Sequence, residues 1–257
     1  MSGLFITGTD TGVGKTEVTL ALMAALQQQG QRALGMKPVA SGCAAGPAPA
    51  LPDPLADGPA GAGLASIRAC LPALGTGPTA LRSDDAERLL AQGSQPMPYE
   101  LINPYAFAPP IAPHIAAGLA GVEIALETID TAYQALAAQT DWVLVEGVGG
   151  WRVPLGPRLA VSDLPAALGL PVVLVVGLRL GCLNHALLTC EAIRRSGLAL
   201  AGWVANLLDP LMPVREENVA TLATLIDAPL LGSLPWLPAP ATAALAAGLD
   251  LRPLLAG

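Results

Sequence analysis

Lys15 and Thr16 have the residue types and the spacing for phosphate chemistry, because they end a glycine-rich turn at residues 8–14. An apolar run at residues 4–6 precedes the turn, and helix-forming residues 17–29 follow it. In such a strand–loop–helix unit, backbone N–H groups and the positive end of the helix dipole surround an anion. The lysine reaches the outer phosphates and the hydroxyl holds Mg²⁺. The sequence therefore predicts a phosphate-binding loop.

The loop departs from the usual pattern G-x-x-x-x-G-K-T at one position. Its first glycine is Gly8, one residue earlier than the pattern requires, and Thr9 takes the expected place. An ordinary glycine-rich turn is the alternative. The strand before the loop and the Lys-Thr pair at its end favour a phosphate loop.

A second lysine, Lys37, stands near the end of a strand predicted at residues 31–39, and the sequence PVASG follows it. Parallel sheets bind their ligands at the carboxyl ends of the strands, so this lysine is expected to point toward the ligand crevice. A solvated lysine is the alternative. The neighbouring phosphate loop favours a ligand-binding role.

An acidic residue, Glu146, ends an apolar run at residues 142–145 and precedes the glycine-rich sequence GVGG. In phosphate-loop proteins, an acid at the end of a neighbouring strand completes the Mg²⁺ shell, directly or through water. The glycines would let the backbone approach a ligand closely. A structural acid beside a flexible turn is the alternative reading.

Asp84 and Asp85 open a short predicted helix, whose N-cap is Ser83 or Asp84. Capping is the ordinary role of such residues, and a metal-linked carboxylate that faces the phosphate loop is the alternative. His114 ends an irregular, proline-rich segment at residues 103–114. Its side chain is either a general base or a capping or packed residue.

Composition excludes several classes of function. The 257 residues are 53% hydrophobic and 13% charged, which allows a large core. The net charge is −7 and the 13 basic residues form no cluster, so we expect no nucleic-acid partner. Two histidines and four cysteines without a C-x-x-C pair disfavour a zinc site. The sequence holds no uninterrupted membrane span and no signal peptide, so we expect a cytoplasmic protein without a membrane partner.

The alternation of apolar strands and helices predicts a single α/β domain over residues 1–257, with a parallel sheet covered by helices on both faces. Further strands are predicted at residues 170–177, 200–206 and 230–234. Further helices are predicted at residues 122–139, before Arg195, at residues 213–227 and, as one packed helix, in the tail. Residues 43–82 are rich in proline, glycine and alanine, and we interpret them as a surface insertion that hangs in solvent rather than forming a lid.

Several of these segments together closely resemble dethiobiotin synthetases, a family with a phosphate-loop NTPase-like fold. The resemblance covers nearly the whole chain outside residues 43–82, and it includes Thr9 in the first-glycine position. The segments that carry it are residues 8–16 (GTDTGVGKT), 37–42 (KPVASG), 103–105 (NPY), 113–115 (PHI), 145–151 (VEGVGGW), 181–185 (GCLNH) and 202–206 (GWVAN).

The resemblance implies an ATP- and Mg²⁺-dependent ligase of biotin biosynthesis. One amine of 7,8-diaminononanoate takes up CO₂ as a carbamate, whose oxygen attacks the γ-phosphate of ATP. The second amine then closes the ureido ring and releases phosphate. Positioning and charge neutralisation dominate catalysis of such a phosphoryl transfer.

The resemblance also assigns roles to residues. It makes Lys37, Lys15 and Thr11 catalytic, and it places Thr16, Asp85 and Glu146 around Mg²⁺; Asp85 is preferred to Asp84 because Ala86 follows it. The implied nucleotide contacts are Gly12, Val13, Gly14, Lys15, Thr16, Glu17, Asp85, Glu146, Gly147, Val148, Gly149, Asn206, Leu207, Pro235, Trp236 and Leu237. The implied substrate contacts are Thr11, Lys37, Ser41, Gly149, Gly150, Leu180, Gly181, Cys182 and Asn184.

The family resemblance further implies a homodimer, in which the segment around Leu180 to Asn184 of one chain receives the substrate carboxylate of the other. Asn218 stands where the family often has a tyrosine. A partition-type ATPase is one alternative, but that class carries a lysine where Thr9 and Asp10 stand. An amidating synthetase is another, but it requires a glutamine-hydrolysing domain for which this chain has no room. A binding module without catalysis is disfavoured by the intact lysines.

Overall fold

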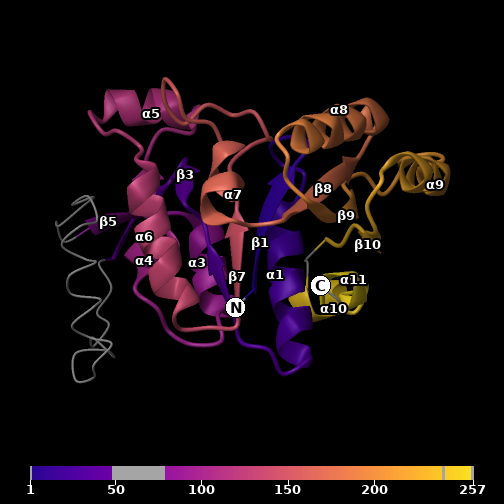
Figure 1. Ribbon diagram of the computed structural model, residues 1–257, viewed down its shortest axis with the longest axis horizontal. Helices are drawn as coiled ribbons and strands as arrows, with labels where there is room; N and C mark the ends of the chain where they lie inside the picture. The colour runs from indigo at the N-terminus through magenta and orange to yellow at the C-terminus, as the bar shows by residue number, and fades with distance from the viewer. Residues whose placement is uncertain (1, 48–78, 239–240, 256–257) are drawn as a thin grey trace.

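Six parallel strands form the centre of the computed structural model, which describes residues 2–47, 79–238 and 241–255 (Figure 1). The strand order is β10-β9-β8-β1-β7-β2. The strands are β1 (Ser2–Gly8), β2 (Ala33–Met36), β7 (Trp142–Glu146), β8 (Val172–Leu178), β9 (Leu200–Leu207) and β10 (Leu230–Leu234). Every pairing in this sheet is parallel, which confirms the predicted fold class.

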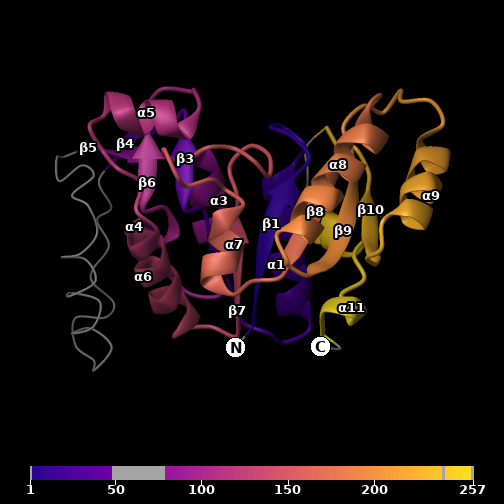
Figure 2. The same cartoon turned by 45° about the horizontal axis from the view of Figure 1, so that its top comes forward.

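Helices cover both faces of the sheet, as predicted. Helices α1, α3 and α10 pack together on one face, whereas α6, α7 and α8 lie on the other, with α9 beside α8 (Figure 2). The helices are α1 (Lys15–Gln28), α3 (Asp84–Gln92), α4 (Tyr99–Ile102), α5 (Pro113–Leu119), α6 (Leu126–Ala137), α7 (Asp163–Leu168), α8 (Cys182–Arg195), α9 (Arg215–Leu225), α10 (Thr242–Ala246) and α11 (Arg252–Leu255). Within the described ranges, no helix has the length and apolarity to cross a membrane.

The register of three neighbouring strands brings the predicted site residues together. Ile6 of β1 is level with Glu146 of β7, and Met36 of β2 is level with Val145. The residue after Met36 therefore lies beside Glu146, and the glycine-rich loop begins two residues after Ile6. Because the strands are parallel, all three ends open on the same edge of the sheet, where α/β proteins bind ligands.

Two small sheets stand beside this edge. Strand β3 (Val39–Ser41) pairs in parallel with β6 (Tyr105–Phe107), and β4 (Ala44–Pro47) pairs antiparallel with β5 (Thr79–Arg82). The prediction of an irregular segment through residues 103–114 is therefore wrong at β6, because pairing with β3 overrides the weak local signal. The insertion predicted at residues 43–82 is described only at its two paired ends; residues 48–78 lie outside the described residues.

Two helix predictions also need correction. The tail forms two short helices, because α10 ends at Ala246 and the chain then pairs with the edge strand through the bridge Gly232–Leu249. The helix predicted from residue 122 begins at Leu126, since the N–H of Ala125 donates to the hydroxyl of Tyr105 at 3.0 Å. Helix α7 was not predicted.

Gly35 in β2 offers a test of how tightly α3 packs on the sheet. A Cβ at this position would lie 2.8 Å from Cβ of Leu89 and 3.1 Å from Sδ of Met23. We expect Gly35→Ala to lower the free energy of unfolding by about 1–3 kcal/mol, because Leu89 cannot yield without moving the helix. Thermal unfolding should show a melting temperature lower by about 2–4 °C per kcal/mol.

The same substitution at Gly118 is the control. This residue lies in α5, and a Cβ there would meet no atom within 4 Å. Alanine in a helix is favoured over glycine by roughly 0.5–1 kcal/mol, so Gly118→Ala should leave the melting temperature unchanged or raise it. Equal changes in the two variants would contradict the close packing of α3.

Candidate active site

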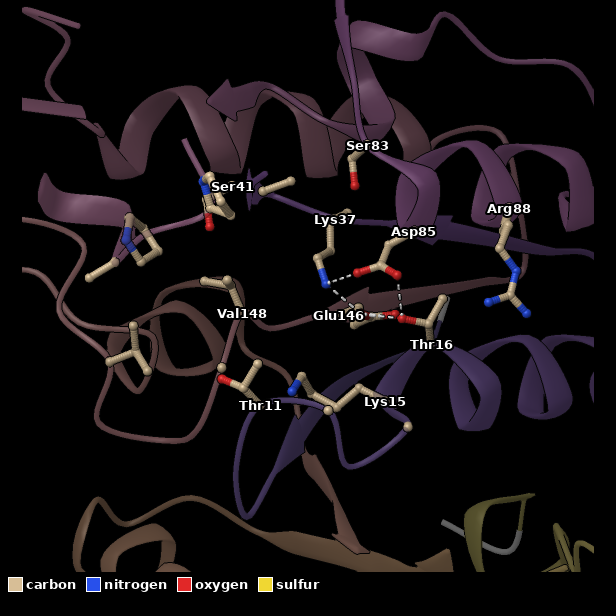
Figure 3. Close-up of a pocket in the computed structure, with 18 of the residues that line it drawn as sticks. Thr11, Lys15, Thr16, Lys37, Ser41, Ser83, Asp85, Arg88, Glu146 and Val148 are labelled. Atoms are coloured by element: carbon tan, nitrogen blue, oxygen red, sulfur yellow. Dashed lines mark hydrogen bonds and ion pairs between the residues drawn. The ribbon is translucent and has the colours of Figure 1, made fainter. Parts of the chain in front are cut away.

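A cavity of about 710 Å³ opens where β1, β2 and β7 end (Figure 3). It contains both lysines of the chain, Lys15 and Lys37. Its walls come from the glycine-rich loop, the ends of β2 and β7, the start of α3 and the segment before α5. The lining residues are Thr11, Gly12, Gly14, Lys15, Thr16, Glu17, Lys37, Ala40, Ser41, Ser83, Asp85, Arg88, Pro110, Ile111, Ala112, Pro113, Glu146, Val148, Gly149 and Val153.

The glycine-rich loop has the geometry of an anion-binding loop. Gly14 has a φ of 84°, and a Cβ there would lie 2.1 Å from Nδ2 of Asn206, so only glycine fits. Asn206 donates from this atom to the carbonyl of Val13 at 2.9 Å and thereby supports the loop from behind. Helix α1 begins at Lys15, whose ammonium donates to the carbonyl of Asp10 at 3.0 Å. Residues 14–17 at this helix start line the cavity, and the first N–H groups of a helix are free to bind an anion.

Four polar side chains meet at the centre of the cavity (Figure 3). The ammonium of Lys37 donates to Oδ2 of Asp85 at 2.8 Å and to Oε1 of Glu146 at 2.5 Å. The hydroxyl of Thr16 lies 2.9 Å from Oδ1 of Asp85 and 2.9 Å from Oε1 of Glu146. Lys37 is 4% exposed and Glu146 is 1% exposed, so these charges are held away from bulk water.

The two lysines have opposite pKa shifts. Burial disfavours the charged form of Lys15 and the nearby Lys37 repels it, so the pKa of Lys15 is lowered to about 8. Burial would also lower the pKa of Lys37, but Glu146 and Asp85 outweigh it and raise that pKa above its usual value. Partial burial opposes ionisation of Asp85, yet Lys37 holds the pKa of this carboxyl below its usual range. The centre of the cavity is thus a compensated cluster of charges.

The donor set fits Mg²⁺. This ion prefers oxygen ligands and is usually bound through one or two carboxylates together with substrate phosphates and water. Asp85 and Glu146 supply such oxygens, and each has one oxygen 2.9 Å from the Thr16 hydroxyl, which is a third oxygen donor. In addition, Oε2 of Glu146 is buried without a hydrogen-bond partner among the described residues. Asp84 is exposed, so only the second aspartate faces the loop.

The structure brings together one group of predicted residues around Lys37. Figure 3 shows Thr11, Ser41 and Val148 to one side of this lysine, and Thr16 to the other. These side chains come from three separate segments of the sequence, and they share one cavity.

Other predicted residues lie elsewhere in this chain. Leu180 is fully exposed and Gly181 and Asn184 are exposed, at the start of α8, whereas Cys182 is buried behind them. Leu207 and Pro235 line a different cavity of about 550 Å³ beside α9. Trp236 and Leu237 do not line the main cavity.

Sequence reasoning missed Arg88 and Asp10. The guanidinium of Arg88 lines the cavity and pairs with Glu17 at 2.7 Å, and its position three residues after Asp85 on one helix could have signalled a shared face. The carboxylate of Asp10 accepts the N–H of Thr11 at 2.7 Å and pairs with Arg179. No local pattern signals that second pairing, because β8 approaches the loop only in the fold.

His114 does not line the cavity, although its neighbour Pro113 does. The imidazole Nδ1 is buried without a hydrogen-bond partner in the described part of the chain, and the residue lies in the first turn of α5. Of the two roles considered from the sequence, this position favours a packed histidine over a general base.

Comparison with known proteins yields close relatives over the full chain. The family model described as AAA domain matches residues 2–243. The ATP-dependent dethiobiotin synthetase BioD of Pseudomonas aeruginosa (strain UCBPP-PA14) is 49% identical over 99% of this chain and 98% of that protein. The protein of the same name from Cellvibrio japonicus is 46% identical over 98% of this chain and 96% of its own length.

Among solved structures, the septum site-determining protein MinD of Pyrococcus horikoshii, complexed with Mg-ADP, matches with a TM-score of 0.48 and 16% identity. The match covers 92% of this chain and 82% of that one.

Replacing Lys37 tests the charge balance of the cavity. Lys37→Met would remove the ammonium that pairs with the carboxylates of both Asp85 and Glu146. We expect the free energy of unfolding to fall by about 3 kcal/mol, because a buried charge loses its partner. Millimolar Mg²⁺ should restore part of this loss by binding between the carboxylates, and it should raise the melting temperature of the variant more than that of the wild type.

Lys15→Met is the matched control, since Lys15 is equally buried but donates to a backbone carbonyl instead of a carboxylate. This variant should lose less stability and should gain no additional response to Mg²⁺. A Lys37→Met protein that responds to Mg²⁺ no more than the wild type would show that these carboxylates do not bind the ion.

Proposed function

Because the chain belongs to the family of ATP-dependent dethiobiotin synthetases, we propose that its cavity converts 7,8-diaminononanoate, CO₂ and ATP into dethiobiotin, ADP and phosphate. The observation that carries this proposal is the meeting of Lys15 and Lys37 with Thr16, Asp85 and Glu146 in one cavity. Cations, a hydroxyl and carboxylates are the groups that transfer of a phosphoryl group from Mg-ATP requires.

The chemistry consists of three bond-forming steps. First, one amine of the substrate adds to CO₂ and loses a proton, giving a carbamate. Second, a carbamate oxygen attacks the γ-phosphorus, the bond to the β-phosphate oxygen breaks, and ADP leaves with that electron pair. Third, the other amine attacks the carbonyl carbon of the resulting anhydride, loses its proton and expels phosphate, which closes the ureido ring.

The chain's own residues hold the charges in these steps. The loop N–H groups and Lys15 would bind the β- and γ-phosphates at the start of α1. Lys37 would neutralise the carbamate as it approaches the γ-phosphorus, since its ammonium shares the cavity with the loop and with Ser41 (Figure 3). Holding both reactants within one cavity replaces a bimolecular encounter by a positioned one.

We propose that Thr16, Asp85 and Glu146 hold Mg²⁺ together with the phosphates. The bound ion would supply charge neutralisation at the β- and γ-phosphate oxygens. The fit of these oxygen donors, and the unpartnered buried Oε2 of Glu146, support the assignment.

The adenine contacts and the setting of the enzyme complete the proposal. Asn206 and Leu207 are the last two residues of β9, and the turn at residues 235–237 follows β10. Both lie on the side of the sheet away from Lys37. We propose that they surround the adenine. A cytoplasmic location is consistent with a reaction that consumes ATP.

We further propose a homodimer in which the start of α8 completes the partner's site. Leu180, just before α8, is fully exposed, and Leu188 of α8 and Leu211 are also exposed apolar residues. The start of α8 also offers N–H groups that suit a substrate carboxylate. Neither Gly181 nor Asn184 lines the chain's own cavity, as expected if both serve the second copy.

The direct test is phosphate release from Mg-ATP in the presence of bicarbonate, measured with and without 7,8-diaminononanoate. We expect release to depend on the diamine, and mass spectrometry should detect dethiobiotin in equal amount. Release without the diamine, or release without ring closure, would contradict the proposal.

Lys37→Gln tests the chemical role of this lysine. We expect turnover to fall by about 100-fold or more, because one positioned charge at a transferring phosphoryl group contributes several kcal/mol. ATP binding, followed by calorimetry, should change little, since Lys15 and the loop remain. Arg88→Gln is the control: it removes another cation of the same cavity, one that Glu17 already neutralises, and should retain most activity.

Mixing two inactive variants tests the shared site. Lys37→Gln removes the charge in a chain's own cavity, whereas Asn184→Asp would place a negative charge beside the partner's substrate carboxylate. Each variant alone should be nearly inactive at low diamine concentration. After the dimers exchange subunits, about a quarter of wild-type activity should return, because half the dimers are mixed and each contains one intact site. If mixing restores no activity, Asn184 does not act across an interface.

A further inference from the structure

Two buried side chains, Tyr99 and Asn103, connect the backbone of Lys37 to the start of the helix that carries Asp85. We propose that they are positioning residues, which hold this lysine and this aspartate at the distance that the reaction needs. The inference rests on the proposed function only for the identity of the reaction. The connection itself is a continuous chain of hydrogen bonds.

On the lysine side, Asn103 fixes the backbone immediately after β2. Its Nδ2 donates to the carbonyl of Lys37 at 2.7 Å and to the carbonyl of Tyr105 at 3.1 Å. The N–H of Lys37 donates to the carbonyl of Ile102 at 2.7 Å. Both backbone polar groups of Lys37 are therefore held by the segment between α4 and β6, and the direction in which its side chain leaves the backbone is set there.

On the aspartate side, Tyr99 fixes the first turn of α3. Its hydroxyl accepts the N–H of Ser83 at 2.7 Å and donates to Oδ1 of Asn103 at 3.0 Å. Ser83 is the N-cap of α3, and Asp85 lies in the first turn after it. The guanidinium of Arg82 also stacks over the Tyr99 ring, 3.9 Å from its centroid. The start of the helix is thus tied to the residue that holds Lys37.

This connection matters because Lys37 and Asp85 are far apart in the sequence. Lys37 and Asp85 are 48 residues apart in sequence, and residues 48–78 between them lie outside the described part. Tyr99 and Asn103 join them through two side chains that are each 4% exposed. Removing one partner would leave another buried polar group without a hydrogen bond. The backbone of Lys37 and the start of α3 would then shift until that group regains a hydrogen bond. Displacements of about 1 Å at a reacting centre can lower a rate by about 100-fold.

Tyr99→Phe and Tyr105→Phe form a matched pair for the test. Each removes one buried hydroxyl that accepts the N–H of a helix N-cap residue, Ser83 of α3 for Tyr99 and Ala125 of α6 for Tyr105. We expect both variants to lose similar stability in thermal unfolding. Only the hydroxyl of Tyr99 is linked to Asn103, so only Tyr99→Phe should disturb the pair of Lys37 and Asp85.

Three measurements separate positioning from stability. Tyr99→Phe should lower kcat about tenfold or more while the KM for 7,8-diaminononanoate changes little. It should also raise the Mg²⁺ concentration for half-maximal rate, because Asp85 is displaced. Calorimetry without the diamine should show that Mg²⁺ strengthens ATP binding less in Tyr99→Phe than in the wild type, a readout that needs no turnover. Tyr105→Phe should match the wild type in all three.

Equal kcat and equal Mg²⁺ dependence in the two variants, at similar stability, would overturn the proposal. If Tyr99→Phe does not fold, Asn103→Ser is compared with Tyr105→Phe by the same criteria. A wild type that makes no dethiobiotin would refute the proposed function instead, and the calorimetric comparison would then still decide whether Tyr99 positions Asp85 for Mg²⁺.

Discussion

The ammonium of Lys37 between the carboxylates of Asp85 and Glu146 is the interaction on which the site depends. Glu146 is buried at the end of a central strand, where an unpaired carboxylate would be costly. The register of β2 beside β7 supplies the compensating charge, since the residue after Met36 is level with Glu146. The position of the cluster therefore follows from strand pairing, and a one-residue slip of β2 would turn Lys37 to the opposite face of the sheet.

The use of lysine in this chain is informative. Its 13 basic residues include only two lysines, and both line the same cavity. A lysine ammonium is a compact charge with three donors on a flexible stem, whereas the arginine guanidinium is a rigid fork. A compact charge suits partners that change during a reaction, such as phosphates and a carbamate. The remaining basic residues are all arginines, and three of them form ion pairs, with Asp10, Glu17 and Asp141.

The sequence predicted those elements whose own residues show the apolar pattern of a strand or a helix. The apolar runs predicted β1, β7, β8 and β9, because strands buried on both faces are continuously apolar. The edge strand β10 was predicted from a shorter run that glycine and serine interrupt. Three sides of the cavity were also predicted: the glycine-rich loop, the lysine at one strand end and the glutamate at another. Strand β6 and the division of the tail were missed, since β6 exists only by pairing with β3, and the tail breaks only to bridge Gly232.

The same distinction explains what the sequence could say of the site. Lys15, Lys37 and Glu146 stand at ends of regular elements, so their direction follows from the sheet. Asp84 and Asp85 are adjacent, and only the rotation of α3 decides which of them faces the loop. That rotation is set by the N-cap at Ser83, whose N–H donates a hydrogen bond to the hydroxyl of Tyr99. A sequence pattern can indicate the residues that contact a ligand. The residues that position them act through contacts between distant segments, so they are identified only in the folded structure.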